Sequence, residues 1–234
     1  MNDFLLNVLF PKRCVGCKGF GSYLCASCFA LIEYMTHFVC AECTRPSVDG
    51  AVHPRCKKSY GLDGVSSSVV YKGVVKKLLY AFKYKPFLAD LKNIISDIAY
   101  EGFLHNESLY YVAQYNPLVT CVPLYAKKLK LRGYNHAALL AYMFAQKFEL
   151  EFLDKILIRA KDTKPQFKLS KENRLGNIKD AFIINRSLKQ FIAGKKIFLV
   201  DDVATTFSTL SECAKVLKQN GASFVWGVTF AREM

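Results

Sequence analysis

Lys196-Ile-Phe-Leu-Val-Asp-Asp-Val-Ala-Thr-Thr-Phe-Ser-Thr209 is the stretch of sequence that decides the fold. Its apolar run 197–200 is typical of a buried central strand, and residues 208–220 have the spacing of a helix. Asp201 and Asp202 then fall at the carboxyl end of the strand, where open α/β sheets bind their ligands. This stretch therefore predicts an α/β fold with a ligand site at one edge of the sheet.

Four hydroxyl residues follow the two acids and open the helix: Thr205, Thr206, Ser208 and Thr209. Hydroxyl groups and backbone amides at a helix N-terminus form a cradle for phosphate. Two adjacent carboxylates beside such a cradle suit a sugar diol or a magnesium-bound diphosphate. The alternative interpretation is an ordinary helix N-cap next to an exposed pair of aspartates.

Strands and helices alternate through residues 61–234, which favours a parallel sheet in one domain. The expected strands cover residues 65–71, 119–122, 155–159, 182–184 and 224–230, and the expected helices cover 74–84, 87–105 and 137–150. Residues 1–60 have little helix and are predicted to form a separate, small zinc-ribbon module. The fold class is thus an α/β domain with an N-terminal metal-binding module.

Seven of the nine cysteines lie in the first 56 residues, mostly as C-x-x-C pairs. Two residues between ligands let one tight turn direct both side chains to a tetrahedral zinc ion, and two such turns complete the site. The predicted ligands are Cys14, Cys17, Cys25, Cys28, Cys40, Cys43, His53 and Cys56. Spacing allows sequential or crossed pairing of these turns and leaves the number of zinc ions open. The alternatives are a redox C-x-x-C for the cysteines and a solvated loop position for the histidine.

The composition bounds the class of protein. With 52% hydrophobic and 22% charged residues, the chain is not disordered or of low complexity. No run of 18 apolar residues predicts a transmembrane helix, and the first residues lack the basic start of a signal peptide. We therefore expect a cytoplasmic, reduced protein. The apolar segment 4–10 either packs on the ribbon or rests on the inner-membrane surface beside Lys12 and Arg13.

Basic residues are concentrated in the middle of the chain. Residues 122–196 carry 17 basic and 6 acidic residues, a net +11 out of a total of +14. Aromatic residues interrupt this stretch, and a positive surface with aromatic rings is typical of proteins that bind single-stranded nucleic acid. The predicted DNA-binding residues are Lys127, Lys128, Lys130, Lys168 and Lys171. The alternative is a solvated basic face with aromatic residues in the core.

Four groups of residues carry a resemblance to known families. LVDDVATTFST, at residues 199–209, resembles the ribose-phosphate signature of type I phosphoribosyltransferases. The other segments, taken with the cysteine pairs, resemble the ComF family of bacterial DNA-uptake proteins over nearly the whole chain. They are Leu79-Tyr-Ala-Phe-Lys83-Tyr, Val122-Pro-Leu with Arg132-Gly-Tyr-Asn135-His, and Thr163-Lys-Pro-Gln166 with Arg174-x-x-Asn177 and Asp180-Ala-Phe182.

The resemblance implies a site for phosphoribosyl pyrophosphate (PRPP) with Mg²⁺. Asp201 and Asp202 would hold the ribose hydroxyls, and the hydroxyl residues of 205–209 would hold the 5′-phosphate. The Arg132-Gly133 turn would lie near the pyrophosphate, because glycine permits close approach and arginine offers a forked anion contact. Further residues of the loop or the cleft would be Val203, Ala204, Phe207, Lys83, Gln166 and Arg174, of which the last three equally suit a solvated surface.

Two positions depart from the families' patterns. Phe207 stands where phosphoribosyltransferase loops usually have glycine, so the loop is either crowded or built with a different backbone angle. His136 stands where ComF relatives often have glutamine, and we expect a surface histidine at the start of a helix rather than a phosphate contact.

The resemblance implies a protein that binds and handles incoming single-stranded DNA in the cytoplasm during natural transformation. An active Mg²⁺-dependent phosphoribosyltransferase is the first alternative, although the sequence marks neither an acceptor site nor an activated nucleophile. A zinc-ribbon adaptor for another competence protein is the second. The sequence leaves the oligomeric state open.

Overall fold

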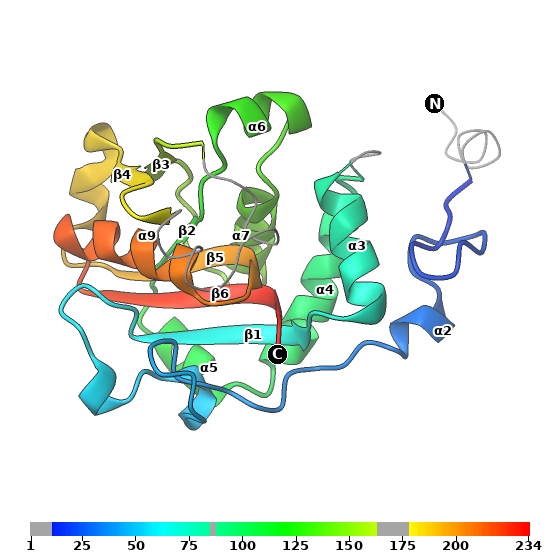
Figure 1. Cartoon of the computed structure of the whole chain (residues 1–234), viewed down its shortest axis with the longest axis horizontal. Helices are drawn as coiled ribbons and strands as arrows, with labels where there is room; N and C mark the ends of the chain where they lie inside the picture. Colours follow the sequence, from blue (N-terminus) through cyan, green and yellow to red (C-terminus); the bar gives the residue numbers. More distant parts are fainter. Residues whose placement is uncertain (1–10, 85–87, 163–177) are drawn as a thin grey trace.

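The computed structural model describes residues 11–84, 88–162 and 178–234, and its centre is a four-stranded sheet (Figure 1). The strand order is β1-β6-β5-β2, and every neighbouring pair is parallel. The bounds are Gly64–Val70 for β1, Leu118–Cys121 for β2, Lys196–Ala204 for β5 and Phe224–Arg232 for β6. The predicted α/β class with a parallel sheet is confirmed.

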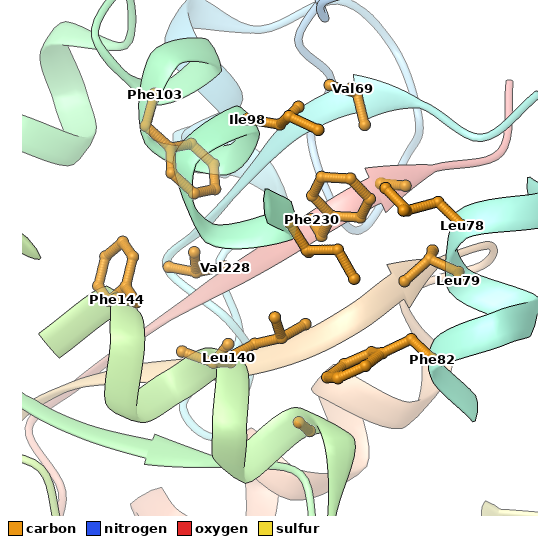
Figure 2. Packing of buried hydrophobic residues seen from close by; sticks show 14 of the residues in the cluster. Val69, Leu78, Leu79, Phe82, Ile98, Phe103, Leu140, Phe144, Val228 and Phe230 are labelled. Carbon is orange, nitrogen blue, oxygen red and sulfur yellow. The ribbon is translucent and has the colours of Figure 1, made fainter. Parts of the chain in front are cut away.

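Helices cover both faces of this sheet. One face carries three helices, and the other carries α9 with a two-stranded antiparallel hairpin. The three helices are α3 (Gly73–Lys83), α4 (Leu91–Phe103) and α7 (His136–Lys147); α9 spans Ser208–Gln219, and the hairpin consists of β3 (Leu157–Arg159) and β4 (Phe182–Ile184). Figure 2 shows Phe82 of α3, Phe144 of α7 and Phe230 of β6 in the first of these cores.

Several short elements are not predicted by the sequence pattern. They are α5 (Glu107–Ala113), α6 (Ala126–Arg132), the 3-10 segment η4 (Arg186–Ile192), and, in the cysteine-rich region, α2 (Ala26–Phe29), η1 (Val48–Gly50) and η2 (Pro54–Cys56). All residues of α6 are exposed or half-buried. A helix without a buried stripe has no apolar periodicity, so the pattern used for longer helices cannot detect it.

The cysteine-rich region is joined to the sheet by main-chain hydrogen bonds. Residues 33–35 run antiparallel to the outer edge of β1, where Met35 N donates to Ser68 O and Val70 N donates to Glu33 O, both at 2.8 Å. The predicted boundary at residue 60 stays a prediction. Within the three described ranges, no helix has the length and apolar character needed to cross a membrane.

Candidate functional site

Two groups of four metal-binding side chains lie in the N-terminal region. In each group, one ligand atom per residue lies within 4.8 Å of the other three. The first group consists of Cys14, Cys17, Cys25 and Cys28, and the second consists of Cys40, Cys43, His53 and Cys56. Four sulfur or imidazole ligands at this separation fit a tetrahedral zinc ion. The pairing is therefore sequential, which the spacing alone left open, and all eight predicted ligands are used.

His53 is oriented as a zinc ligand. Its Nε2 lies 3.0 Å from the carbonyl oxygen of Pro46, which can only accept, so Nε2 carries the proton. Its Nδ1 lies 3.3 Å from Cys43 Sγ and is left with a lone pair that points into the cluster. A hydrogen bond that fixes the tautomer of a ligating histidine is a usual second contact in zinc sites.

The first cysteine of each group is set up as a thiolate. Burial acts to raise the pKa of Cys14, but backbone amides, chiefly those of Cys17 and Cys25, outweigh it and lower the pKa to about 6. At Cys40 burial is likewise outweighed by backbone amides, and the pKa is lowered to about 7. Metal binding requires the deprotonated sulfur, so the lowered pKa values of Cys14 and Cys40 favour zinc at both groups.

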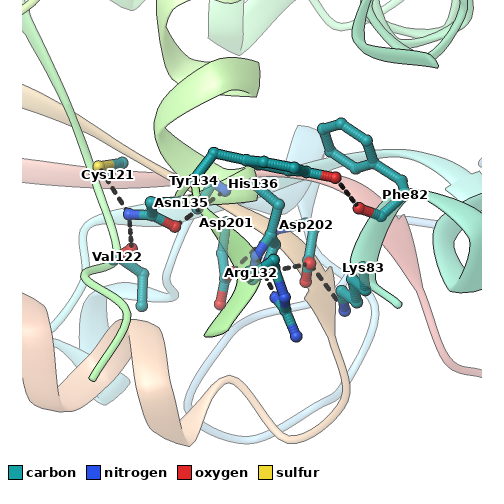
Figure 3. Close-up of polar contacts among 11 residues, drawn as sticks. Phe82, Lys83, Cys121, Val122, Arg132, Tyr134, Asn135, His136, Asp201 and Asp202 are labelled. Carbon is teal, nitrogen blue, oxygen red and sulfur yellow. Dashed lines mark hydrogen bonds and ion pairs between the residues drawn. The ribbon is translucent and has the colours of Figure 1, made fainter. Parts of the chain in front are cut away.

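A second cluster, made of charged side chains, lies at the carboxyl end of β5 (Figure 3). Asp202 is only 4% exposed, and its Oδ2 lies 2.7 Å from both Lys83 Nζ and His136 Nε2. Lys83 is the last residue of α3 and His136 is the first of α7, so the cluster joins two helices to the strand. Asp201 is next to it, and its Oδ1 accepts a 2.8 Å hydrogen bond from the amide of Asp202.

Arg132 completes the cluster through His136. Its Nη1 lies 2.6 Å from His136 Nδ1, and since guanidinium only donates, Nδ1 accepts. The proton of the neutral ring is then on Nε2, facing Asp202. Burial, followed by the positive charges of Lys83 and Arg132, lowers the pKa of His136 despite Asp202. His136 therefore links Arg132 to Asp202 as a neutral group, and the predicted surface position for it is wrong.

The cluster divides its charge unequally between the two aspartates. Burial would raise the pKa of Asp202, but Lys83 and His136 outweigh it and hold the pKa below its ordinary value. Burial also opposes the charge of Lys83, but the negative charge of Asp202 raises its pKa. At Asp201, burial and the charge of Asp202 raise the pKa to about 7. Near neutral pH, Asp202 is thus a compensated carboxylate and Asp201 is close to half-protonated.

The segment between α6 and α7 is fixed by hydrogen bonds on both sides. Tyr134 donates from its hydroxyl to Phe82 O at the end of α3. Asn135 donates from Nδ2 to Val122 O, 3.1 Å away, and its side chain also caps α7. Gly133 allows the turn that precedes them, because it has a φ of 83°. Arg132 and His136 are therefore both held at the carboxyl edge of the sheet.

The loop after β5 keeps the backbone angle of a glycine at Phe207. Its φ is 55° and its ψ is 2°, in the left-handed region, and it directly precedes α9. The ring is 3% exposed, and the Arg232 guanidinium carbon lies 5.5 Å from its centroid. A non-glycine residue in this region costs roughly 1–2 kcal/mol, which burial of the ring offsets. Phe207 thus adopts the left-handed backbone angle that is usual for glycine, and its ring points into the core, away from the loop.

The hydroxyl residues of this loop lie at the first turn of α9. Thr206 Oγ1 and Ser208 Oγ are 2.9 Å apart. Thr205 and Thr209 are half-buried beside them. The N-cap residue of α9, Phe207, makes no side-chain capping hydrogen bond, and the first amides of the helix form the positive end of its dipole.

The predicted DNA-binding lysines are only partly described. Lys127 and Lys130 are exposed on α6, whereas Lys128 lies 3.5 Å from Asp162. Lys168 and Lys171, as well as Gln166 and Arg174 of the predicted cleft, lie outside the described residues, and so does the apolar segment 4–10. The ring of Phe182 is 3% exposed in the core.

The chain is similar to known proteins both in its metal-binding region and over longer stretches. A double zinc ribbon domain matches residues 5–57. Competence protein F of Haemophilus influenzae is 39% identical over 112 residues, which are 47% of this chain and 48% of that protein. DNA utilization protein YhgH of Escherichia coli K12 is 33% identical over 107 residues, 46% of this chain and 45% of that protein. The match thus spans about half the length of these two relatives.

A third relative is matched over more of its length. Competence protein ComFC of Bacillus subtilis is 28% identical over 209 residues, which cover 85% of this chain and 79% of that protein. The names of these three relatives all refer to competence or DNA utilization.

Proposed function

This chain is a ComF-family protein with an N-terminal zinc ribbon, and from this premise we propose that it handles incoming single-stranded DNA in the cytoplasm during DNA uptake. We further propose that the charged cluster and the loop 203–209 bind phosphoribosyl pyrophosphate or a related sugar phosphate. The names of the relatives, two competence proteins and a DNA utilization protein, support the first part.

The observation that carries the ligand site is the buried Asp202, which is held by Lys83 and His136 and lies on the strand that leads into the N-terminus of α9. Carboxylate oxygens accept from sugar hydroxyls, and the amides and hydroxyls at the start of α9 suit a phosphate. Arg132 lies at the same edge and offers further donors to a diphosphate. A phosphorylated sugar matches both halves of this arrangement.

Mg²⁺ belongs to this proposal through the diphosphate of the ligand. One ligand atom each of His136, Asp201 and Asp202 lies within 4.8 Å of the other two. However, His136 presents a proton and Lys83 already compensates Asp202, so this set is poor at holding a bare cation by itself. We therefore expect Mg²⁺ to bind together with the diphosphate of the ligand, with Asp201 as the nearest available carboxylate.

Thermal denaturation tests the ligand site. Phosphoribosyl pyrophosphate with Mg²⁺ is expected to raise the melting temperature of the wild type, because a ligand that binds the folded state stabilises it. Asp201→Ala with Asp202→Ala should abolish the shift. Asp97→Asn, which removes the exposed partner of Lys147, is the control and should leave the shift intact. An unchanged shift in the double variant contradicts the proposal.

The salt dependence of DNA binding tests the basic surface. Charge reversal at Lys127, Lys128 and Lys130 is expected to weaken binding and reduce the slope of log K against log salt, because fewer counterions are released. The matched control reverses Arg186, Lys189 and Lys195, which are exposed near the amino end of β5, at the other edge of the sheet. Equal slopes for the wild type and the first variant would place the DNA elsewhere.

A further inference from the structure

Two tyrosines at the C-terminal end of α3, Tyr80 in the helix and Tyr84 directly after it, form an exposed aromatic pair beside the charged cluster. Tyr80 is 61% exposed and Tyr84 is 38% exposed, and their ring centroids are 4.8 Å apart with an interplanar angle of 33°. Tyr84 directly follows Lys83, the partner of Asp202. The Arg132 guanidinium carbon lies 5.4 Å from the Tyr84 centroid, while Nη1 of the same side chain contacts His136. The pair therefore lies next to the charged cluster.

The charged residues of α3, which ends directly before Tyr84, are all basic. The sequence of α3, GVVKKLLYAFK, contains three lysines and no acid. Lys76 precedes Tyr80 by one helical turn and lies 5.2 Å from the Tyr71 centroid, and Lys77 donates to Gly16 O at 2.9 Å. Both are exposed, and neither has a carboxylate partner in the part of the chain that the structure describes. Aromatic faces and uncompensated positive charge thus occur together on one side of α3.

A second tyrosine pair shows what this one offers. Tyr111 and Tyr115 of the α5 region are also exposed, at 60% and 50%, but their rings are nearly perpendicular at 77°. Their hydroxyls are hydrogen bonded at 2.7 Å, and Lys196 Nζ lies 3.2 Å from the Tyr115 centroid, so one ring face is already covered. Compared with that pair, Tyr80 and Tyr84 have a smaller interplanar angle, and the cation next to Tyr84, Arg132, is farther from the ring, at 5.4 Å.

We propose that Tyr80 and Tyr84 are a stacking platform for the bases of single-stranded nucleic acid, with Lys76, Lys77 and Arg132 contacting its phosphates. Unpaired bases present flat faces that stack on aromatic rings, whereas a duplex hides them. Charge complementarity selects a polyanion as the occupant. This inference rests on the proposed function, and it places the strand against α3 rather than only along α6.

Fluorescence anisotropy with a labelled oligodeoxythymidine tests the platform. Tyr80→Ala with Tyr84→Ala is expected to weaken binding by roughly 10- to 100-fold, since stacking contributes roughly 1–3 kcal/mol per base. The salt slope should stay that of the wild type, because no charge is removed. Tyr80→Phe with Tyr84→Phe should bind as the wild type does. Tyr111→Ala with Tyr115→Ala is the matched control and should leave the affinity unchanged.

The outcomes separate this inference from the proposed function. A wild type that binds no single strand overturns both. A wild type that binds, with an alanine variant of equal affinity, overturns the platform alone. An abasic oligonucleotide of the same length should bind the wild type and the alanine variant equally; a persisting difference would mean that the rings do not stack on bases. If a mononucleotide displaced the labelled oligonucleotide as well as an unlabelled oligonucleotide of equal concentration does, a platform specific for a strand would likewise be overturned. Melting temperature and zinc content check that the variants are folded.

Discussion

The two halves of the zinc ribbon use the same local structure in different surroundings. In each half, the amide of the first cysteine donates to the carbonyl five residues later, Cys14 to Gly19 at 2.8 Å and Cys40 to Arg45 at 2.9 Å. The residue after the second cysteine has a positive φ in both, 69° at Lys18 and 59° at Thr44. The C-x-x-C spacing therefore fixes the turn by itself, whether the four ligands of the group are all cysteines or include a histidine.

The difference between the halves is what they pack against. The first half lies on α3, where Cys14, Val15 and Cys28 join the core beneath Val74. The second half belongs to the opposite core, with Cys40 and Val52.

The second half is also bonded to the sheet and to α5. Ala51 forms a bridge to Gly64 of β1. Asp49 Oδ2 accepts from Ser108 N, the second residue of α5, at 3.1 Å. We infer that the second half is part of the support of the sheet, whereas the first half mainly positions α3.

Removal of one zinc ligand from each half is the strongest way to break this comparison. Cys40→Ser is expected to cost several kcal/mol and lower the melting temperature by about 10 °C or more, because structural zinc supplies folding energy and this half supports β1. Cys14→Ser should lose one zinc but lower the melting temperature by less than half as much. Calorimetry and colorimetric zinc titration measure both quantities.

The control for the cysteine pair is Cys213→Ser, a buried cysteine in neither group. It should keep the zinc content of the wild type. Equal losses of stability in Cys14→Ser and Cys40→Ser would remove the distinction between the halves.

Two glycines sharpen the comparison. A Cβ at Gly50, where φ is 87°, would lie 1.8 Å from Val65 O, so Gly50→Ala must displace the main chain of β1. A Cβ at Gly16 would lie 2.5 Å from Cys28 Sγ, so Gly16→Ala displaces a zinc ligand instead. We expect Gly50→Ala to lose about 3 kcal/mol or more with zinc retained, and Gly16→Ala to lower zinc affinity with a smaller loss. Gly19→Ala, whose nearest contact is 3.4 Å away, is the control.

The sequence predicts the parts of the molecule in which local pattern and tertiary structure agree. The buried strand 197–200 and the helix after Ser208 are examples, because an apolar run and a helical spacing each have one solution in a parallel sheet. The C-x-x-C turns are another. Residues 126–132 have no such pattern, and the helix there depends on the tertiary structure around it.

The candidate site shows the limit of the sequence more clearly. Asp201 and Asp202 are found from their place after an apolar strand, but nothing local indicates that Lys83 and His136 would meet the second of them. These contacts join residues from α3, α7 and β5. The available signal was only the common position of these residues at element ends on one edge of a parallel sheet.

Phe207 links the comparison to the candidate site. It borders a small cavity together with Met35 and His37, which belong to the segment that joins the two halves. Phe207→Gly relieves the left-handed backbone strain of about 1–2 kcal/mol but loses a buried ring worth about 3–5 kcal/mol. The expected net effect is a destabilisation of about 1–4 kcal/mol in urea unfolding, with ligand-induced stabilisation retained. Phe207→Leu is the control, since it keeps the strain and most of the burial; a more stable glycine variant would mean that strain dominates.

The pH dependence of stability distinguishes the charged cluster from both halves of the ribbon. The pKa of Asp201 is about 7 in the folded protein against an ordinary value of 3.8, so the folded state holds an extra proton between these values. Stability from this group therefore falls as the pH rises through that window, by up to about 1.4 kcal/mol per pH unit. The lowered pKa of Asp202 acts below the window and adds no slope within it.

Asp201→Asn isolates this effect. Zinc release in acid lowers the stability of the wild type and the variant equally, because thiolates of both halves are protonated in each protein. The variant should therefore gain stability relative to the wild type as the pH rises from about 5.5 to 7.5 in urea unfolding, where the half-buried carboxylate of the wild type is forced to ionise next to the charge of Asp202. A difference that is independent of pH would mean that Asp201 ionises at an ordinary pKa, and that the site presents two charged carboxylates to its ligand rather than one.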